Sequence, residues 1–255
     1  AKAKSKAHGI SCVNNNKQLM MAWSFYADDN DDRITWAYGD IGASRTTYAY
    51  GWMGNISLDY GPHPKNWDPL HRQSLAWSPL WEHISRNAAV FRCPADTSTV
   101  NAGKKHGVKP RVRSMSMNAW VGGDGQNGRG RGHHTWFGER KDGTMFLKRS
   151  DMSVQGASKV WVLIDERMDS INDGFFVVWM PGYPDPKKTI MVDFPASYHN
   201  NAAGLSFADG HAEIRKWQDP RTVPPLQKNG KIPLNQPQPN NPDVIWLQER
   251  TTSPR

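Results

Sequence analysis

The first 27 residues contain no proline, and their apolar side chains recur at the spacing of an α-helix. An unbroken helix rises about 1.5 Å per residue, so this segment predicts a rod about 40 Å long. The acidic run at 28–32 ends the apolar stripe, and we expect the helix to stop there. The stripe consists of Ile10, Val13, Leu19, Met20 and Trp23, mostly three or four residues apart.

The rest of the chain has the composition of a loop-rich β protein, with 22 Gly and 18 Pro. A second helix is predicted from Ser74 to about Arg86, although Pro79 weakens it. Loops are expected at 37–73, which is rich in Gly, Tyr and Trp, and at 101–112 and 122–144, which are rich in Gly, Lys and Arg. Strands are predicted at 160–164, 175–180 and 190–194, with a short one near 34–36.

These elements indicate an α+β fold in which a long N-terminal helix packs on an antiparallel β-sheet with long Gly- and Trp-rich loop insertions. A length of 255 residues suits one large domain. We expect three parts: the helix at 1–27, a β-sheet head at 28–219, and an extended C-terminal tail at 220–255. The tail is rich in Pro, Gln and Asn, which favours local packing only.

A hairpin is the clearest local feature of the sequence. Asp209-Gly210 lies between two short apolar segments and is typical of a two-residue turn. Such a turn would pair Phe207 with Ala212 and Leu205 with Ile214, which gives one apolar face. The opposite face is then predicted to meet solvent, and it carries Ser206, His211, Glu213 and Arg215.

The formal net charge of +8 favours acidic partners. Such partners are nucleic acid, anionic lipid and acidic polysaccharide. Most basic residues are dispersed along the chain, and a dispersed excess usually serves solubility alone. Of the three partners we expect acidic polysaccharide and not nucleic acid. Twelve Trp residues also suit a surface that stacks on sugar rings, although Trp is equally a large core residue. No run of about 18 apolar residues is present, so the sequence predicts no membrane span.

Several separate segments resemble one family of bacterial proteins. His199, nine intervening residues and Asp209-Gly210 reproduce the H-x9-DG signature of prepilin-type processing-associated proteins. The other matching segments are Cys12-Val13-Asn14 to Leu19, Tyr26 to Asn30, Phe91-Arg92-Cys93-Pro94-Ala95-Asp96, Ser116-Met117-Asn118, Asp165-Glu166 and Ser170 to Gly174. Together they are scattered over roughly residues 1–217.

The resemblance implies a type IV pilin-like fold and a subunit related to the pseudopilins of type II secretion. It implies an extracellular, cell-surface or periplasmic location, and other pseudopilin subunits as partners once a membrane helix is present. The methylated N-terminal residue and the apolar half-helix of that family are missing, so we expect this sequence to be the soluble part. The family implies packing and display rather than a reaction.

Two cysteines in an exported chain suggest a single disulfide, here between Cys12 and Cys93. Calcium is the cofactor that the sequence favours most, because Asp28, Asn30 and Asp32 alternate as oxygen ligands do in calcium loops. The alternative is an acidic helix end in solvent. A second oxygen-rich patch comprises Asp165, Glu166, Asp169, Asn172 and Asp173.

The string Tyr198-His199-Asn200 has the chemistry of a polysaccharide lyase acting on uronates. His199 would act as base, Tyr198 as acid, and Asn200 or Arg131 would neutralise the carboxylate, with His134 nearby in the basic loop. The sugar chain would bind to Arg129, Arg131, Trp136 and Trp52. The alternative is structural: His199 hydrogen-bonds the Asp209 turn.

Two functions follow from these residues. The favoured one is a pseudopilin-like structural subunit that displays a surface for acidic glycans. The other is a secreted polysaccharide lyase that cleaves uronate-containing polysaccharides by β-elimination.

Overall fold

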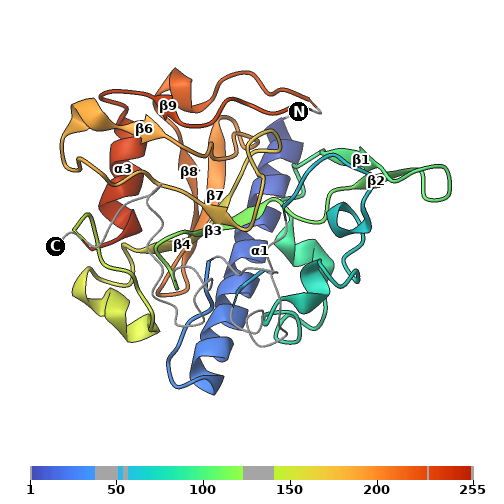
Figure 1. Ribbon diagram of the computed structural model, residues 1–255, viewed down its shortest axis with the longest axis horizontal. Coiled ribbons are helices and arrows are strands. Elements are labelled where there is room, and N and C mark those ends of the chain that lie inside the picture. Colours follow the sequence, from blue (N-terminus) through green and yellow to red (C-terminus); the bar gives the residue numbers. More distant parts are fainter. Residues whose placement is uncertain (1, 38–50, 54–56, 123–140, 229, 254–255) are drawn as a thin grey trace.

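The computed structural model describes residues 2–37, 51–53, 57–122, 141–228 and 230–253. These residues form an α+β fold with a long N-terminal helix and a five-stranded sheet (Figure 1). Within the described residues, no helix combines the length and the apolar character needed to cross a membrane.

Helix α1 spans Lys2–Asp29, which confirms the predicted N-terminal helix. Its buried face includes Cys12, Asn16, Leu19 and Trp23, spaced by three or four residues. Ile10, which was predicted to belong to the apolar stripe, is 57% exposed. In this part of the helix the packed face therefore carries Cys12 and Asn16, whereas the hydrophobic pattern predicted Ile10 and Val13 there.

Helix α1 ends where the acidic run begins. The backbone N–H of Asp32 donates to the carbonyl of Ala27 at 2.9 Å, and Asp31 adopts a left-handed conformation with φ of 55°. This is the bonding pattern of a Schellman cap, usually made with Gly or Asn. The exposed carboxylates at this negative end of the helix dipole receive a neutralising charge from Arg149.

The main sheet has the order β5-β3-β4-β7-β8. It is mixed rather than wholly antiparallel as predicted, because β3 and β5 pair in parallel. Its strands are β3 (Met115–Asn118), β4 (Trp161–Asp165), β5 (Phe175–Phe176), β7 (Ala202–Phe207) and β8 (Ala212–Lys216). Two small antiparallel pairs flank it: β1 (Thr99–Asn101) with β2 (Val108–Pro110), and β6 (Ile190–Met191) with β9 (Gln236–Pro237).

The predicted hairpin forms between β7 and β8, but in a different register. Ser206 pairs with Ala212, and Gly204 pairs with Ile214. The loop holds three residues rather than two, because the N–H of Phe207 donates to the carbonyl of His211, and Gly210 has a φ of 91°. A three-residue loop with its last residue in the left-handed region shifts the pairing by one residue relative to a two-residue turn.

Strand β7 is buried on both faces, which corrects the expectation of a solvent-facing side. A Cβ on Gly204 would lie 2.8 Å from the Cys12 sulfur, which places that face against α1. Ser206 lies on the same face by strand alternation and is fully buried. On the other face, the guanidinium of Arg215, which pairs with Ala203, lies over the ring of Trp246 in helix α3.

Other predicted elements are shorter than expected. The segment predicted as a second helix forms only the 3₁₀ turn Leu75–Trp77 and further turns, since Pro79 lacks an N–H and restricts the residue before it. The residues predicted as a strand near 34–36 make only isolated bridges. The other 3₁₀ helices of the described residues are Pro64–Asn66, Ala88–Phe91, Arg149–Val154, Pro186–Lys188 and Pro220–Thr222.

The C-terminal segment is not simply extended, because it contains helix α3 (Pro242–Thr251). The Asn241 side chain caps this helix by accepting the backbone N–H groups of Asp243 and Val244. Thr251 of α3 bonds to Trp161 of β4 through its hydroxyl, at 3.0 Å. Figure 1 shows α1 and α3 on opposite sides of the strands, so two helices sandwich the sheet.

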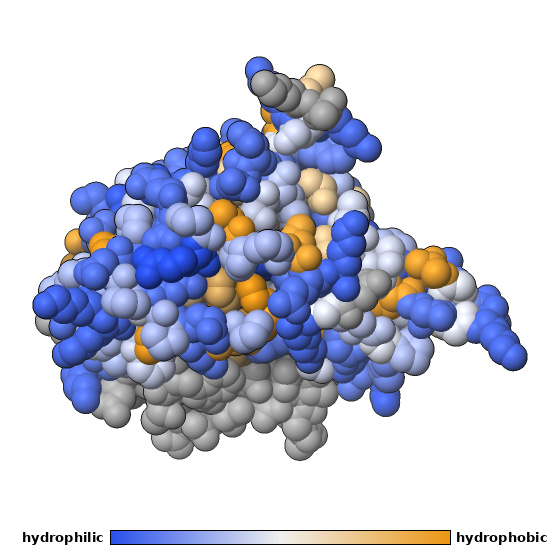
Figure 2. All heavy atoms as spheres, turned by 90° about the horizontal axis from the view of Figure 1, so that it is seen from above, coloured by the Kyte–Doolittle hydropathy of each residue, from blue (hydrophilic) through white to orange (hydrophobic). Residues whose placement is uncertain are grey.

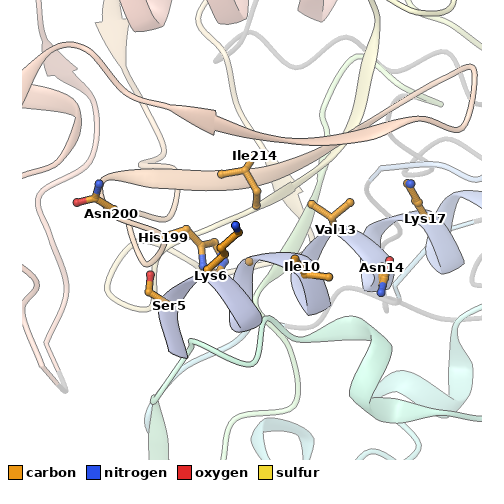
Figure 3. Close-up of a pocket in the computed structure, with 10 residues that line it drawn as sticks. Ser5, Lys6, Ile10, Val13, Asn14, Lys17, His199, Asn200 and Ile214 are labelled. Atoms are coloured by element: carbon orange, nitrogen blue, oxygen red, sulfur yellow. The ribbon is translucent and has the colours of Figure 1, made fainter. Parts of the chain in front are cut away.

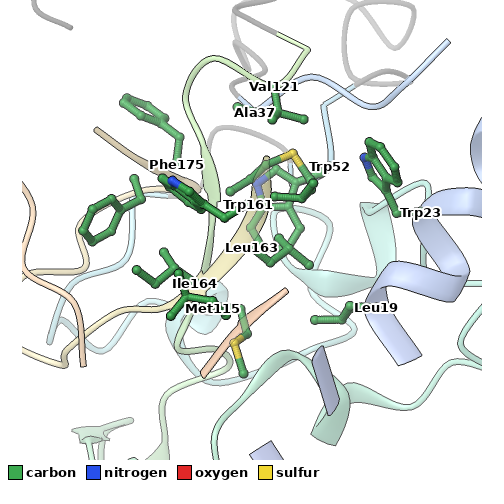
Figure 4. Packing of buried hydrophobic residues seen from close by; sticks show 14 of the residues in the cluster. Leu19, Trp23, Ala37, Trp52, Met115, Val121, Trp161, Leu163, Ile164 and Phe175 are labelled. Atoms are coloured by element: carbon green, nitrogen blue, oxygen red, sulfur yellow. The ribbon is translucent and has the colours of Figure 1, made fainter. Parts of the chain in front are cut away.

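The core lies between α1 and the central strands. Figure 4 shows Leu19 and Trp23 of α1 directed toward side chains of the sheet and its loops, including Trp52, Trp161 and Leu163. On the face seen in Figure 2, apolar residues are scattered among hydrophilic ones. The Trp content of the described chain therefore contributes substantially to packing.

The approach of α1 to β7 yields the first testable prediction. We expect Gly204→Ala to destabilise the fold by about 1–3 kcal/mol, because its Cβ would stand 2.8 Å from Cys12 Sγ and 3.0 Å from Asn16 Nδ2. Chemical denaturation measures this difference. Gly230→Ala is the matched control, since the nearest atom to its Cβ is 3.4 Å away, and an equal loss there would contradict the proposed packing.

Candidate functional site

Four chemically active side chains meet at one buried point between α1 and the sheet. Their ligand atoms all lie within 4.8 Å of one another. Three of the side chains are fully buried and the fourth, His199, is 7% exposed. The members, called the Cys/Asp/His cluster below, are Cys12, Cys93, Asp165 and His199.

Each member comes from a different element. Cys12 lies on the buried face of α1, and Asp165 is the last residue of β4. Cys93 follows the 3₁₀ helix Ala88–Phe91, and its backbone N–H donates to Ser114 Oγ at 2.8 Å. His199 lies in a tight turn before β7, where the next two residues both have a φ of 60°. The cluster therefore exists only in the folded chain.

Two close contacts run across the cluster. Cys93 Sγ lies 3.2 Å from His199 Nε2, and the Cys12 thiol donates to Asp165 Oδ2 at 3.8 Å. The structural alternative for His199, a bond to the Asp209 turn, is not what forms. Asp209 instead accepts from His211 at 2.6 Å. His199 lies before the first residue of β7 and Asp209 lies after its last residue, so the length of the strand separates them.

Burial changes the acid–base behaviour of the cluster. Loss of solvent raises the pKa of Asp165 well above its usual value, and the neighbouring Cys93 raises it further, against the hydrogen bond from Ser114. The hydrogen bond with Cys12 raises the pKa of Cys93, and burial raises it further, whereas burial lowers the pKa of His199. Without a cation, neutral forms are favoured throughout.

A groove of about 810 Å³ leads to the cluster from the surface. One wall is the exposed side of α1, with Lys6, Ile10 and Val13, and the other is formed by Asn200 and Ile214 (Figure 3). His199 lines the groove on one side and contacts Cys93 on the other. It is thus the member of the cluster nearest to solvent.

The residues predicted for lyase chemistry have separate surroundings. The Tyr198 hydroxyl accepts the backbone N–H of Met168 at 2.7 Å, and burial raises the pKa of Tyr198 well above its usual value. His199 faces Cys93, and Asn200 is exposed. Three adjacent residues are therefore directed at a backbone amide, a thiol and solvent.

The predicted sugar-binding residues are only partly described. Trp52 is fully buried, and its indole N–H donates to the carbonyl of Gly174 at 2.6 Å, so its ring belongs to the core. The predicted residues Arg129, Arg131, His134 and Trp136 lie outside the described residues.

The oxygen atoms predicted to bind calcium have protein partners. Arg149 pairs with Asp28 at 2.6 Å and with Asp32 at 3.3 Å. The side-chain amide of Asn30 donates to the carbonyl of Tyr26. The guanidinium supplies a cation to this helix end, and calcium there stays a prediction.

The second oxygen-rich patch divides among several partners. Glu166 accepts from Ser116 and Ser170, and Asp169 forms a buried two-point pair with Arg167. Asp173 accepts the backbone N–H of Phe175, while Asp165 belongs to the Cys/Asp/His cluster. The carboxylates that adjoin in sequence thus stabilise different parts of the fold.

Comparison of the chain with protein-family models, with curated proteins and with solved structures finds no match. The assignment of a function therefore rests on the residues and their geometry.

Sequence reasoning brought Cys12 and Cys93 together, and the structure places them within 4.8 Å as free thiols. The disulfide expected for an exported chain stays a prediction. Sequence reasoning did not connect either cysteine with Asp165 or His199. The available signal was that all four lie in the segments that carry the family resemblance.

A pH-dependent prediction follows from Asp173. Burial raises its pKa from 3.8 to about 6, so its stabilising contribution is complete below about pH 4 and is lost as pH rises through 6. Asp173→Asn keeps the acceptor for Phe175 and cannot ionise. We expect this substitution to leave the free energy of unfolding unchanged at pH 4 and to raise it by up to about 3 kcal/mol at pH 8.

Denaturation at the two pH values checks this expectation. Asp219→Asn is the control of opposite sign, because hydrogen bonding from Arg221 lowers the pKa of Asp219, and its removal should destabilise at pH 8. Equal effects of Asp173→Asn at both pH values would show that its ionisation is not linked to folding.

Proposed function

We propose that the chain is a pseudopilin-like structural subunit that works outside the cytoplasm. The observation that supports this most concerns the segments that resemble the family, because four of them each contribute one residue to the Cys/Asp/His cluster where α1 packs on the sheet. Cys12 and Asp165 contact each other across this junction. Residues placed there connect elements and are not presented to a substrate.

Other residues of these segments also serve the fold. The side chain of Asn15 donates to the carbonyls of Ala89 and Arg92, which ties α1 to the neighbouring 3₁₀ helix. Asn118 donates to the carbonyls of Trp161 and Thr251, which joins β3 to β4 and to α3. Side-chain amides used in this way, half-buried at Asn15 and buried at Asn118, stabilise one arrangement of elements.

The exposed side of α1 offers the contact that a filament subunit needs. Met21 is 59% exposed and Phe25 is 48% exposed, one helical turn apart. In a type IV pilin-like assembly, the N-terminal helices pack together, and these apolar side chains would lie between subunits. The partner we propose is therefore a second pseudopilin-like subunit.

Lyase chemistry finds less support in the described residues. A general acid needs its proton directed at the substrate, and the Tyr198 hydroxyl is engaged by the Met168 amide. A general base needs an accessible nitrogen, and His199 Nε2 faces Cys93. We propose display rather than catalysis for this reason.

An acidic glycan has a suitable place on the described surface. A groove of about 460 Å³ is lined by Trp179, Lys187 and Lys188, and both lysines are exposed. The only described ion pair there joins Lys188 to Asp185 at 3.8 Å, and exposed pairs of this kind contribute little. An indole beside two ammonium groups suits a sugar ring that bears carboxylates.

Surface exposure and self-association test the structural role in cells that make this protein. We expect a membrane-impermeant lysine reagent to label it before lysis, and a cross-linker to give multimers. Met21→Asp should abolish the multimers by placing a charge in the helix contact. Val154→Asp is the matched control, because Val154 is 85% exposed outside α1.

Labelling only after lysis, or multimers that survive Met21→Asp, would contradict the proposal. Release of unsaturated product from any uronate polysaccharide, followed by ultraviolet absorbance, would replace it with the lyase.

The glycan groove has its own test. We expect the Lys187→Ala/Lys188→Ala variant to bind polygalacturonate roughly tenfold or more weakly at low salt, since two charges near the ligand are lost. Affinity electrophoresis measures the difference. Lys104→Ala/Lys105→Ala is the matched control, because it removes equal charge from two exposed lysines of the β1–β2 loop. Equal weakening by both variants would show that binding depends on net charge and not on this groove.

A further inference from the structure

We propose that the Cys/Asp/His cluster is a structural zinc site that fastens helix α1 to the sheet. This inference does not depend on the chain being a filament subunit. It rests on the kind of side chains that meet, their separations, and the hydrogen bonds that surround them.

The donor set matches the preferences of zinc. Zn²⁺ in structural sites takes four ligands, mainly thiolates and imidazoles, with an occasional carboxylate. The cluster provides two sulfurs, one imidazole nitrogen and one carboxylate oxygen. Calcium and magnesium favour sites made of oxygen alone, so they do not suit two sulfurs.

The separations also agree with a tetrahedral ion. Bonds of about 2.0–2.3 Å to a central zinc give a tetrahedron with edges of about 3.3–3.8 Å. Cys93 Sγ to His199 Nε2 measures 3.2 Å, and Cys12 Sγ to Asp165 Oδ2 measures 3.8 Å. All remaining pairs lie within 4.8 Å, so small side-chain movements complete the tetrahedron.

Hydrogen-bond donors surround the cluster and point at its sulfurs and carboxylate. Asn16 Nδ2 approaches Cys12 Sγ at 3.8 Å, and the backbone N–H of Ala95 donates to Cys93 Sγ at 3.4 Å. Ser114 Oγ donates to Asp165 Oδ1 at 2.6 Å. Donors in this outer position orient metal ligands and stabilise their deprotonated forms.

A disulfide would use the same cysteines, but it would remove the thiol partners of Asp165 Oδ2 and His199 Nε2 and leave Asp165 only its bond from Ser114 at Oδ1. Forming it removes both thiol protons, so Asp165 Oδ2 loses the donor it has in Cys12. His199 Nε2 would then face a sulfur with no proton to share. A bound zinc ion satisfies all four groups at once, since it replaces the two thiol protons and accepts electron pairs from the imidazole and the carboxylate.

A metal ion also has a route to the cluster. The 810 Å³ groove beside α1 is lined by His199, which is the most exposed of the four ligands. Zinc arriving there would meet the imidazole first and the two sulfurs behind it.

Metal content of the whole chain tests the proposal. The protein, purified with a phosphine reductant and dialysed against metal-free buffer, is given ZnCl₂ and washed. We expect elemental mass spectrometry to find one tightly bound zinc ion per chain. Cobalt in place of zinc should give an intense thiolate-to-cobalt band in the near ultraviolet, and zinc should raise the Tm while magnesium leaves it unchanged.

Substitutions identify the ligands. We expect His199→Gln and Asp165→Asn each to weaken zinc binding by at least about 100-fold. Loss of a residue that only hydrogen-bonds a ligand weakens metal binding by at most about that factor. His106→Gln is the matched control, because His106 is exposed on the β1–β2 loop. If a variant fails to fold, zinc content and the cobalt spectrum of the unaltered chain still decide.

Two results would overturn the proposal. One is a reduced, folded chain that retains no zinc and shows two titratable thiols. The other is a chain purified without reductant whose mass is lower by two hydrogens and which, after reduction, still takes up no metal; this result would establish the disulfide instead.

Discussion

The close approach of helix α1 to strand β7 is the contact on which the other features depend. It is possible because Gly204 has no side chain: a Cβ there would lie 2.8 Å from Cys12 Sγ. The missing atom lets the helix lie flat on the strand, which brings Cys12 within reach of Asp165 on β4. Hydrophobic burial by Leu19 and Trp23 drives the association, while the glycine sets its depth.

Buried polar side chains replace regular strand pairing over much of the remaining chain. Arg111 is almost completely buried, and its guanidinium donates to the carbonyls of Leu58, Met168 and Ile171. One planar group with several donors thereby fastens the segment at Leu58 to the loop that holds both Met168 and Ile171. Such positions explain how a chain with short strands has a large ordered core. The strands predicted at 175–180 and 190–194 reduce to β5 and β6, and the backbone N–H of Val177 donates to the buried side chain of Asp193 instead of to a strand.

The sequence was most informative where a local pattern was enough. The absence of proline and the helical spacing predicted α1, and the apolar run at 160–164 predicted β4. The hairpin was predicted, but its register was not, because one residue in the left-handed region at Gly210 changes the loop length. Helix α3 was missed since its Pro- and Asn-rich start reads as extended, although Asn241 and Pro242 are good helix-start residues. The Cys/Asp/His cluster could not be predicted from local sequence patterns, because its four residues are far apart in the sequence and come together only in the folded protein.

The position of the cluster along α1 suggests why directional bonds would be useful there. In the first three turns of the helix most described side chains are exposed, and continuous burial begins near Cys12. A helix end without packed side chains frays, because few apolar contacts oppose local opening. Hydrophobic contact resists separation only while the surfaces touch, whereas coordination fixes the distance between Cys12 and the sheet. A tie at this residue would hold the helix in register with β7 while its outer face, with Met21 and Phe25, stays exposed, as the proposed contact with a second subunit requires.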